Sequence, residues 1–346
     1  MKDVRFDSSG SEPVFRFKNA DGVDDRIVFK PSTTDLWNDL NKNDFSVELL
    51  INPILSSARH VYNICLENSK SRVGMVFPVS ALDDKDCFDQ KGENNYAYVA
   101  YWVLLERLDG IDNSDDDLSE NFEDNVCVCV FNLKSLGLSN PLHLCINSLR
   151  KYGYSYFEPE NKIKPVDGYT DVGYVDKNIK NLVVKFEEPK MYGNPVIDMM
   201  LRALPHANNI IHRFVLLYQV IETMMEEISL RKINEEIDKL QKEEIPHNDF
   251  LDNLKRIGQE KVRIKEIFDI CMIDKAEFAC FRDSCKKLYS LTKYNPDNES
   301  EQAMLFYSFR NQMTHTFRNL HCYPQEVADT VQGFEKVIIT ILEKYS

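Results

Sequence analysis

The chain has 346 residues, with 42 Lys and Arg against 56 Asp and Glu, which gives a formal net charge of −14. This acidity excludes the simplest class of nucleic-acid-binding protein, in which a basic surface neutralises phosphates over a whole domain. A nucleic acid would need a local basic patch instead. The apolar fraction of 43% is sufficient for hydrophobic cores, and the length predicts about two domains.

Other classes of protein lose support from what the sequence lacks. No apolar run approaches the ~18 residues of a membrane-spanning helix, and residues 97–105 are the longest candidate. No signal peptide is indicated at the N-terminus. The nine cysteines are scattered, which favours reduced thiols in a cytoplasmic protein. P-loop, Rossmann, α/β-hydrolase and zincin motifs are absent, so we expect neither a cofactor nor a metal.

The first half of the chain is predicted to be β-rich, because residues 1–195 hold 10 of the 12 glycines and 9 of the 13 prolines. Two strands, 14–17 and 26–29, flank an Asp21-Gly22 turn and predict a hairpin. Cys127 and Cys129 share one face of a strand and are assigned to its core rather than to a metal site. The remaining predicted elements are strands at 61–66, 72–77, 96–106, 126–133 and 181–187, a short helix at 141–151 and a loop at 157–174.

Residues 109–124 carry eight acids and no Lys or Arg. Asp112, Ser114, Asp116 and Glu123 match positions 1, 3, 5 and 12 of a calcium loop. The sixth position requires glycine for its sharp turn, but Asp117 stands there. We therefore interpret the segment as a solvated acidic loop.

The second half is predicted to be a bundle of four to six helices. Apolar residues recur every three or four positions from Ile211 to Ile228, and Asn208 or Asn209 is suited to cap that helix. Pro246 breaks the pattern and Pro324 interrupts it again. The expected helices after the first are an antiparallel partner over 247–268, a helix from Asp274 to about Tyr294, one over 300–319 and one over 325–344.

One segment of this half, residues 302–325, contains no acidic residue in an otherwise acidic chain. Such a segment is the local patch that an anionic ligand requires. On a helix, Leu305, Phe309, Met313, Thr316 and Leu320 form the core face, flanked by Phe306 and Phe317. Asn311, His315 and Arg318 lie on nearly the opposite side. Arg310 is about 140° from His315, so we expect their joint action to require a helix start, a bend or an interface between chains.

A carboxylate, Glu222, falls within the apolar stripe of the first bundle helix. A buried carboxylate is costly unless it is paired. Two alternatives follow for its partner: Lys286 or Arg282 on a neighbouring helix, or Arg310.

Arg310-Asn311-Gln312-Met313-Thr314-His315 resembles the Arg-polar-x-x-x-His motif of the HEPN superfamily. The preceding Tyr218-Gln219-Val220-Ile221-Glu222 resembles the matching helix of HEPN domains in bacterial defence proteins of the ApeA-like and abortive-infection types. The resemblance covers residues 200–346. It implies a HEPN-like helical bundle at 196–346. With the β-rich pattern of the first half, the chain is predicted to be α+β, with a β-rich sensor or regulatory domain at 1–190.

The resemblance also implies a function, that of a metal-independent endoribonuclease acting in antiphage defence or as a toxin. HEPN domains typically form homodimers, which would bring two motifs together at the interface of the helical bundles. His315 would be the general acid/base, Arg310 would hold the scissile phosphate, and Asn311 would position either residue or the phosphate. Glu222 and Arg318 would support them.

Three readings of the second half remain open at the level of sequence. The first is the endoribonuclease with RNA as its substrate, in which the first half is a sensor or regulator whose trigger the sequence does not identify. The second is a non-catalytic HEPN-like module for dimerisation or for binding a nucleotide or RNA, and the third is an unrelated helical scaffold.

Overall fold

The computed structural model describes residues 4–9, 13–18, 22–33, 36, 40–52, 60–88, 92–108, 117–157, 180–186, 194–204, 207, 209–296, 301–315 and 317–345. The chain is an α+β protein, as predicted: a β-rich region with two sheets precedes a helical region. These described residues divide into two compact units, the first ending at Phe186 and the second beginning at Asn194. None of the described helices is long and apolar enough to cross a membrane.

The smaller sheet of the first unit is built on the predicted hairpin. Its strands β1 (Arg5–Asp7), β2 (Val14–Lys18) and β3 (Asp24–Val28) are all antiparallel, and Val14 pairs with Val28. Gly22 has a φ of 78°, a left-handed conformation that glycine adopts without strain. The hairpin prediction is confirmed, although residues 19–21 of the turn lie outside the described residues.

The larger sheet has the strand order β8-β4-β7-β6-β5-β9, antiparallel except for the parallel pair β5 and β9. The predictions for β5, β6, β7 and the beginning of β9 are confirmed, whereas β4 was not predicted. Cys127 and Cys129 are buried on β7, and burial raises the pKa of both thiols. The strands are β4 (Phe45–Ile51), β5 (Tyr62–Leu66), β6 (Arg72–Pro78), β7 (Val126–Asn132), β8 (Ser155–Tyr156) and β9 (Asn181–Val184).

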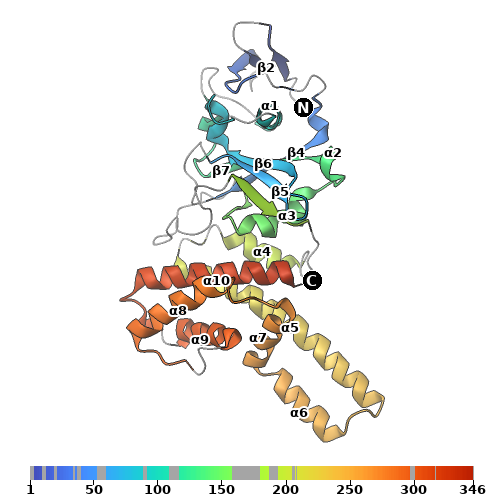
Figure 1. Ribbon diagram of the computed structural model, residues 1–346, viewed down its shortest axis with the longest axis vertical. Coiled ribbons are helices and arrows are strands. Elements are labelled where there is room, and N and C mark those ends of the chain that lie inside the picture. The colour runs from blue at the N-terminus through green and yellow to red at the C-terminus, as the bar shows by residue number, and fades with distance from the viewer. Residues whose placement is uncertain are drawn as a thin grey trace. The chain divides into compact units, whose positions relative to one another are not determined.

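The strand predicted at 96–106 is wrong, because these residues form the helix α1 (Glu93–Arg107). The helix lies between the two sheets (Figure 1) and is buried on nearly every side from Glu93 to Tyr101. A helix that is buried all round carries no apolar stripe to distinguish it from a buried strand. The aromatic rings of α1 contact the small sheet: Tyr101 stacks on Phe15 at 5.3 Å.

Two shorter helices complete the first unit. The predicted helix at 141–151 is α3 (Pro141–Arg150), and α2 (Leu133–Leu136) follows β7. Residues 109–116 of the predicted acidic loop and almost all of the predicted loop 157–174 lie outside the described residues.

The second unit is a helical bundle, as predicted, but its described part has seven helices rather than four to six, because the helix Pro195–Ala203 was not predicted and one expected helix is divided. Asn209 caps its long helix by accepting a hydrogen bond from Ile211 N, and Pro324 stands in the first turn of the last helix. The partner expected over 247–268 is two helices, which separate at Gly258 and Gln259. The helices are α4 (Pro195–Ala203), α5 (Ile210–Gln241), α6 (His247–Ile257), α7 (Glu260–Cys271), α8 (Ala279–Thr292), α9 (Gln302–His315) and α10 (Pro324–Lys344).

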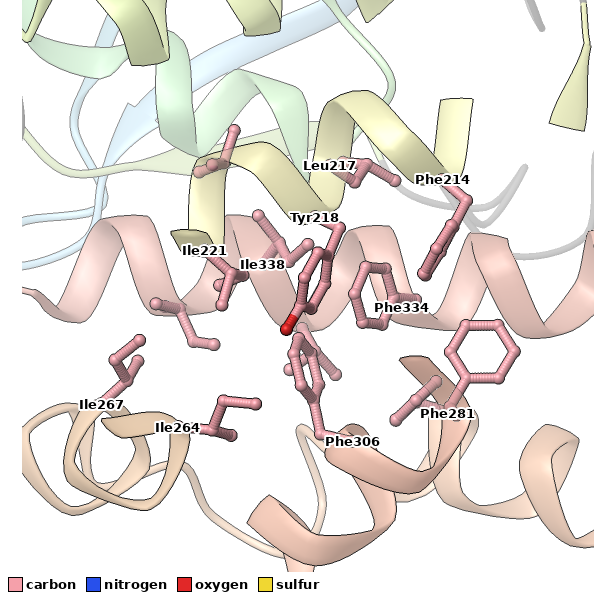
Figure 2. Packing of buried hydrophobic residues seen from close by; sticks show 14 of the residues in the cluster. Phe214, Leu217, Tyr218, Ile221, Ile264, Ile267, Phe281, Phe306, Phe334 and Ile338 are labelled. Atoms are coloured by element: carbon pink, nitrogen blue, oxygen red, sulfur yellow. The ribbon is translucent and has the colours of Figure 1, made fainter. Parts of the chain in front are cut away.

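The core of the bundle centres on Phe334 of α10, whose ring contacts Phe214, Phe281 and Phe306 at 5.3, 5.7 and 4.4 Å. Figure 2 shows these rings with Tyr218 and the isoleucines of α5 and α7. Beyond this core, the second half of α5 and α6 form a hairpin that projects from the other helices (Figure 1).

A buried ion pair joins three helices next to this core. Arg213 of α5 donates from Nε and Nη2 to both carboxylate oxygens of Glu335 in α10, each at 2.8 Å. Its Nη1 donates to the carbonyl of Leu204, directly after α4, also at 2.8 Å. Both charged side chains are less than a tenth exposed, so each charge depends on the other.

Removing one member of this pair is expected to destabilise the bundle strongly. Glu335→Ala leaves the Arg213 guanidinium buried without its carboxylate, and such changes cost about 3–5 kcal/mol. The measurement is the free energy of unfolding in urea, followed by circular dichroism at 222 nm. Asp252→Ala, which removes the exposed pair of Asp252 and Lys255, is the control and should have little effect. Equal effects of the two variants would contradict this account.

The contact between α8 and α10 generates a second expectation. A Cβ added to Gly333 would lie 2.8 Å from the backbone Cα of Phe281. Alanine normally stabilises a helix by about 1 kcal/mol relative to glycine, but overpacking here costs about 1–3 kcal/mol. Gly333→Ala should therefore lower the melting temperature. Gly258→Ala, with its nearest contacts at 3.5 and 3.6 Å, should not, and a gain in stability for Gly333→Ala would refute the close approach.

Candidate functional site

The residues of the Arg-polar-x-x-x-His motif occupy the last two turns of α9. The predicted core face is confirmed for Leu305, Phe309, Met313 and Leu320, which are all buried, as is the flanking Phe306. Nothing is described for the side chains of Thr316 and Phe317. Because the apolar face anchors α9 in the bundle, Arg310 is half-buried at its border and His315 is exposed at the helix end.

Arg310 and His315 contact each other within one chain. The guanidinium Nη1 lies 3.4 Å from the imidazole Nε2. The expectation that this pair needs a helix start, a bend or an interface to meet is therefore wrong. Five residues rise about 7.5 Å along a helix, which the long arginine side chain spans, and α9 ends at His315.

This contact specifies where the imidazole proton lies. A guanidinium has only donors, so the ring nitrogen that faces it must be the acceptor. His315 Nε2 then carries a lone pair and the proton of the neutral ring is on Nδ1. A ring nitrogen with a lone pair at an exposed position has the chemistry of a general base.

The other end of the guanidinium contacts Glu260, the first residue of α7. Arg310 Nε lies 3.1 Å from Glu260 Oε1, an ion-pair distance without the alignment of a hydrogen bond. The hydroxyl of Tyr218 donates to the same oxygen. The guanidinium carbon of Arg310 also lies 5.4 Å from the centre of the Tyr218 ring, a cation–π geometry. Arg310 is therefore held by side chains from two other helices.

The state of Tyr218 follows from this environment. Burial is the largest cause that raises the pKa of its hydroxyl, and the hydrogen bond to Glu260 raises that pKa further. The nearby Arg310 cation opposes this rise only in part. Tyr218 consequently keeps its proton near neutral pH and continues to donate to the carboxylate.

Asn311 contacts the same guanidinium. Its Oδ1 accepts a hydrogen bond from Arg310 Nη1 at 3.0 Å. The Nη1 nitrogen therefore faces both Asn311 and His315, and the structure brings together the three residues that we expected to be catalytic.

In the described part of the chain, neither predicted supporting residue is found in contact with Arg310 or His315. Glu222 is exposed, so its expected burial is wrong. The buried stripe of α5 runs through Leu217, Ile221 and Met224, and Glu222 points about 100° away from Ile221. Among the described residues, neither predicted partner of Glu222 is found beside it, and Glu260 is the carboxylate that contacts Arg310.

Arg318 is exposed in the turn after α9, and its carbonyl lies 2.5 Å from His321 Nδ1. No contact within the described ranges joins its guanidinium to Arg310 or His315. The role of Arg318 therefore stays a prediction.

Sequence analysis missed Glu260. It lies 50 residues before Arg310, at a helix start where a carboxylate is ordinary. Two observations would have favoured it: the break near Gly258 that begins a new helix, and the acidic first turn that this break creates.

The described side chains also bear on metal binding. Across the described ranges, no group of three or more His, Cys, Asp and Glu side chains is arranged to hold a metal ion.

The chain matches no family model, no curated protein and no solved structure in the comparisons with known proteins. The arrangement of residues around Arg310 is therefore the basis for assigning a function.

The tautomer of His315 provides a direct test of the contact with Arg310. In the wild-type protein, at a pH where the ring is neutral, we expect the proton on Nδ1. Long-range ¹H–¹⁵N correlation spectra distinguish the two tautomers, and His321 provides an internal comparison on the same segment. Arg310→Met should release His315 to the mixture of tautomers found in water. An Nε2-protonated ring in the wild-type protein would contradict the geometry.

Proposed function

We propose that this protein is a metal-independent endoribonuclease of the HEPN type. The observation that carries the proposal is the contact between the exposed imidazole of His315 and the guanidinium of Arg310, which Glu260 and Tyr218 hold in place. A phosphodiester needs a cation for its oxygens, and the RNA 2′-hydroxyl needs a base. Arg310 and His315 supply these two functions within 3.4 Å of each other.

In the proposed reaction, a phosphate oxygen takes the place of His315 on Arg310 Nη1 and so frees the lone pair of His315 Nε2. That nitrogen then removes the proton of the 2′-hydroxyl, whose oxygen attacks the adjacent phosphorus. Arg310 binds the phosphate oxygens as negative charge develops on them, and Asn311 restrains its Nη1. The bond from phosphorus to the 5′ oxygen breaks, which leaves a 2′,3′-cyclic phosphate. DNA lacks the nucleophile and is not a substrate.

The 5′ oxygen must receive a proton as it leaves, and His315 begins the reaction without one on Nε2. A second imidazole in the protonated state solves this problem. A homodimer through the helical bundle would bring two such motifs together. We therefore include a composite site made by two copies in the proposal.

The biological setting is proposed from the same resemblance. The protein would act in the bacterial cytoplasm as a toxin or an abortive-infection effector. Its β-rich first unit would sense a trigger, and the helical unit would cleave RNA. The alternative, a HEPN-like module that dimerises or binds a nucleotide or RNA without cleaving it, requires no proton transfer by His315.

The decisive experiment compares wild type and His315→Ala on RNA in the presence of EDTA. We expect wild type to cleave RNA, with cyclic phosphate ends, and to leave DNA of the same sequence intact. His315→Ala should lose at least about 100-fold in rate, the lower range for a general base. Expression of the wild type should be toxic, and Arg310→Ala should relieve the toxicity.

His321→Ala is the matched control, because His321 is an exposed histidine of the same acid-free segment. It should cleave like wild type. Cleavage that EDTA abolishes would refute the metal-independent mechanism, and equal rates for wild type and His315→Ala would refute the site. RNA binding without cleavage by wild type would favour the non-catalytic alternative.

A further inference from the structure

Arginine offers two edges to an anion. The side edge consists of Nε and Nη2, and the end edge consists of Nη1 and Nη2. Arg213 uses its side edge, since Nε and Nη2 each donate to one oxygen of Glu335. Which edge a phosphate meets on Arg310 decides whether that phosphate lies next to His315.

The contacts of Arg310 favour one edge over the other. Glu260 lies against Nε, so a second anion on the side edge would meet a carboxylate. Asn311 and His315 both lie against Nη1, at one end of the other edge, so a phosphate on that edge takes the place of His315 as the acceptor. Among the described residues, no partner of Nη2 is found, so this nitrogen can donate to a ligand.

Three helices converge to fix this orientation. Tyr218 of α5 binds Glu260 through its hydroxyl and lies against the guanidinium with its ring. Glu260 belongs to α7, and Arg310 belongs to α9. Rotation of the guanidinium would break both the ion pair and the ring contact.

We propose that Tyr218 and Glu260 are positioning residues that make Arg310 present its Nη1–Nη2 edge, beside His315, to the scissile phosphate. This role rests on the proposed RNA cleavage. Without Glu260 the side edge becomes open to the phosphate. The RNA would then bind through Arg310 with its 2′-hydroxyl displaced from His315 Nε2. Loss of Glu260 should therefore lower the cleavage rate and leave the affinity for RNA nearly unchanged.

The test uses the full-length protein and the variants Glu260→Gln, Tyr218→Phe and Glu226→Gln. Glu226 is the matched control, because it is an exposed carboxylate on α5 that belongs to no part of the site. Two quantities are measured: the single-turnover rate of cleavage, and the Kd for a 2′-O-methyl RNA that cannot be cleaved. Melting temperatures establish that each variant is folded.

For Glu260→Gln we expect the cleavage rate to fall about 10–100-fold, the range for a misplaced catalytic group, with the Kd within about threefold of wild type. Tyr218→Phe keeps the ring and loses the hydroxyl, so its rate should fall less. In the Glu260→Gln background, Tyr218→Phe should have little further effect, because both act through one carboxylate. Glu226→Gln should cleave like wild type.

Three results would overturn the proposal. A cleavage rate of Glu260→Gln equal to that of wild type would show that the carboxylate does not orient Arg310. A tighter Kd with a faster rate would show that Glu260 only competes with the phosphate. A parallel loss of rate, affinity and melting temperature would show a structural role.

The positioning role can also be tested by a measurement that does not require RNA cleavage. If wild type cleaves no RNA, the proposed function fails, and the Nε–Hε resonance of Arg310 then tests the positioning alone. A shift of that resonance in both Glu260→Gln and Tyr218→Phe, but not in Glu226→Gln, would support it. An unchanged resonance in Glu260→Gln would overturn it.

Discussion

The bundle depends on the buried pair of Arg213 and Glu335, because it connects α5 to α10 and to the end of α4 at one point. Glu335 follows Phe334, the residue at the centre of the aromatic core. A buried ion pair adds little net stability relative to an apolar pair, but any shift of register would leave a charge unpaired. The pair therefore restricts how α5 packs on α10. Tyr218 lies five residues after Arg213 on the same helix, so this restriction extends to the surroundings of Arg310.

Local signals in the sequence predicted most of the fold. Asn209, Pro246 and Pro324 marked helix boundaries through capping and through the missing proline donor, which depend only on neighbouring residues. Glycine at position 22 marked the hairpin in the same way. The strand prediction for residues 96–106 failed because these residues are buried by two sheets, whose strands are separate in sequence from this segment. Aromatic and β-branched side chains that are surrounded on all sides give the same pattern in a helix as in a strand.

The candidate site was predictable only in part, for a related reason. Arg310, Asn311 and His315 are near neighbours in sequence, so a motif identifies them. Glu260 belongs to another helix and becomes their neighbour only when α7 packs on α9. Glu222 was a plausible substitute because it follows Tyr218 by one turn. The side chain of Glu222 nevertheless points to solvent, because Glu222 follows the buried Ile221 and one residue along a helix turns the side chain by about 100°.

The length of α5 has a consequence for how the bundle opens. Its buried residues run from Arg213 to Ile228, whereas Glu236 is the single buried residue after Ile228. In α6 only Ile257 is buried, and Leu230 and Leu251 are more than half exposed. Few apolar contacts imply a small free energy of local unfolding. Amides near the tip of this hairpin should exchange with solvent through fraying that leaves Phe334 and its neighbours packed. One continuous helix thus spans two regions of very different protection.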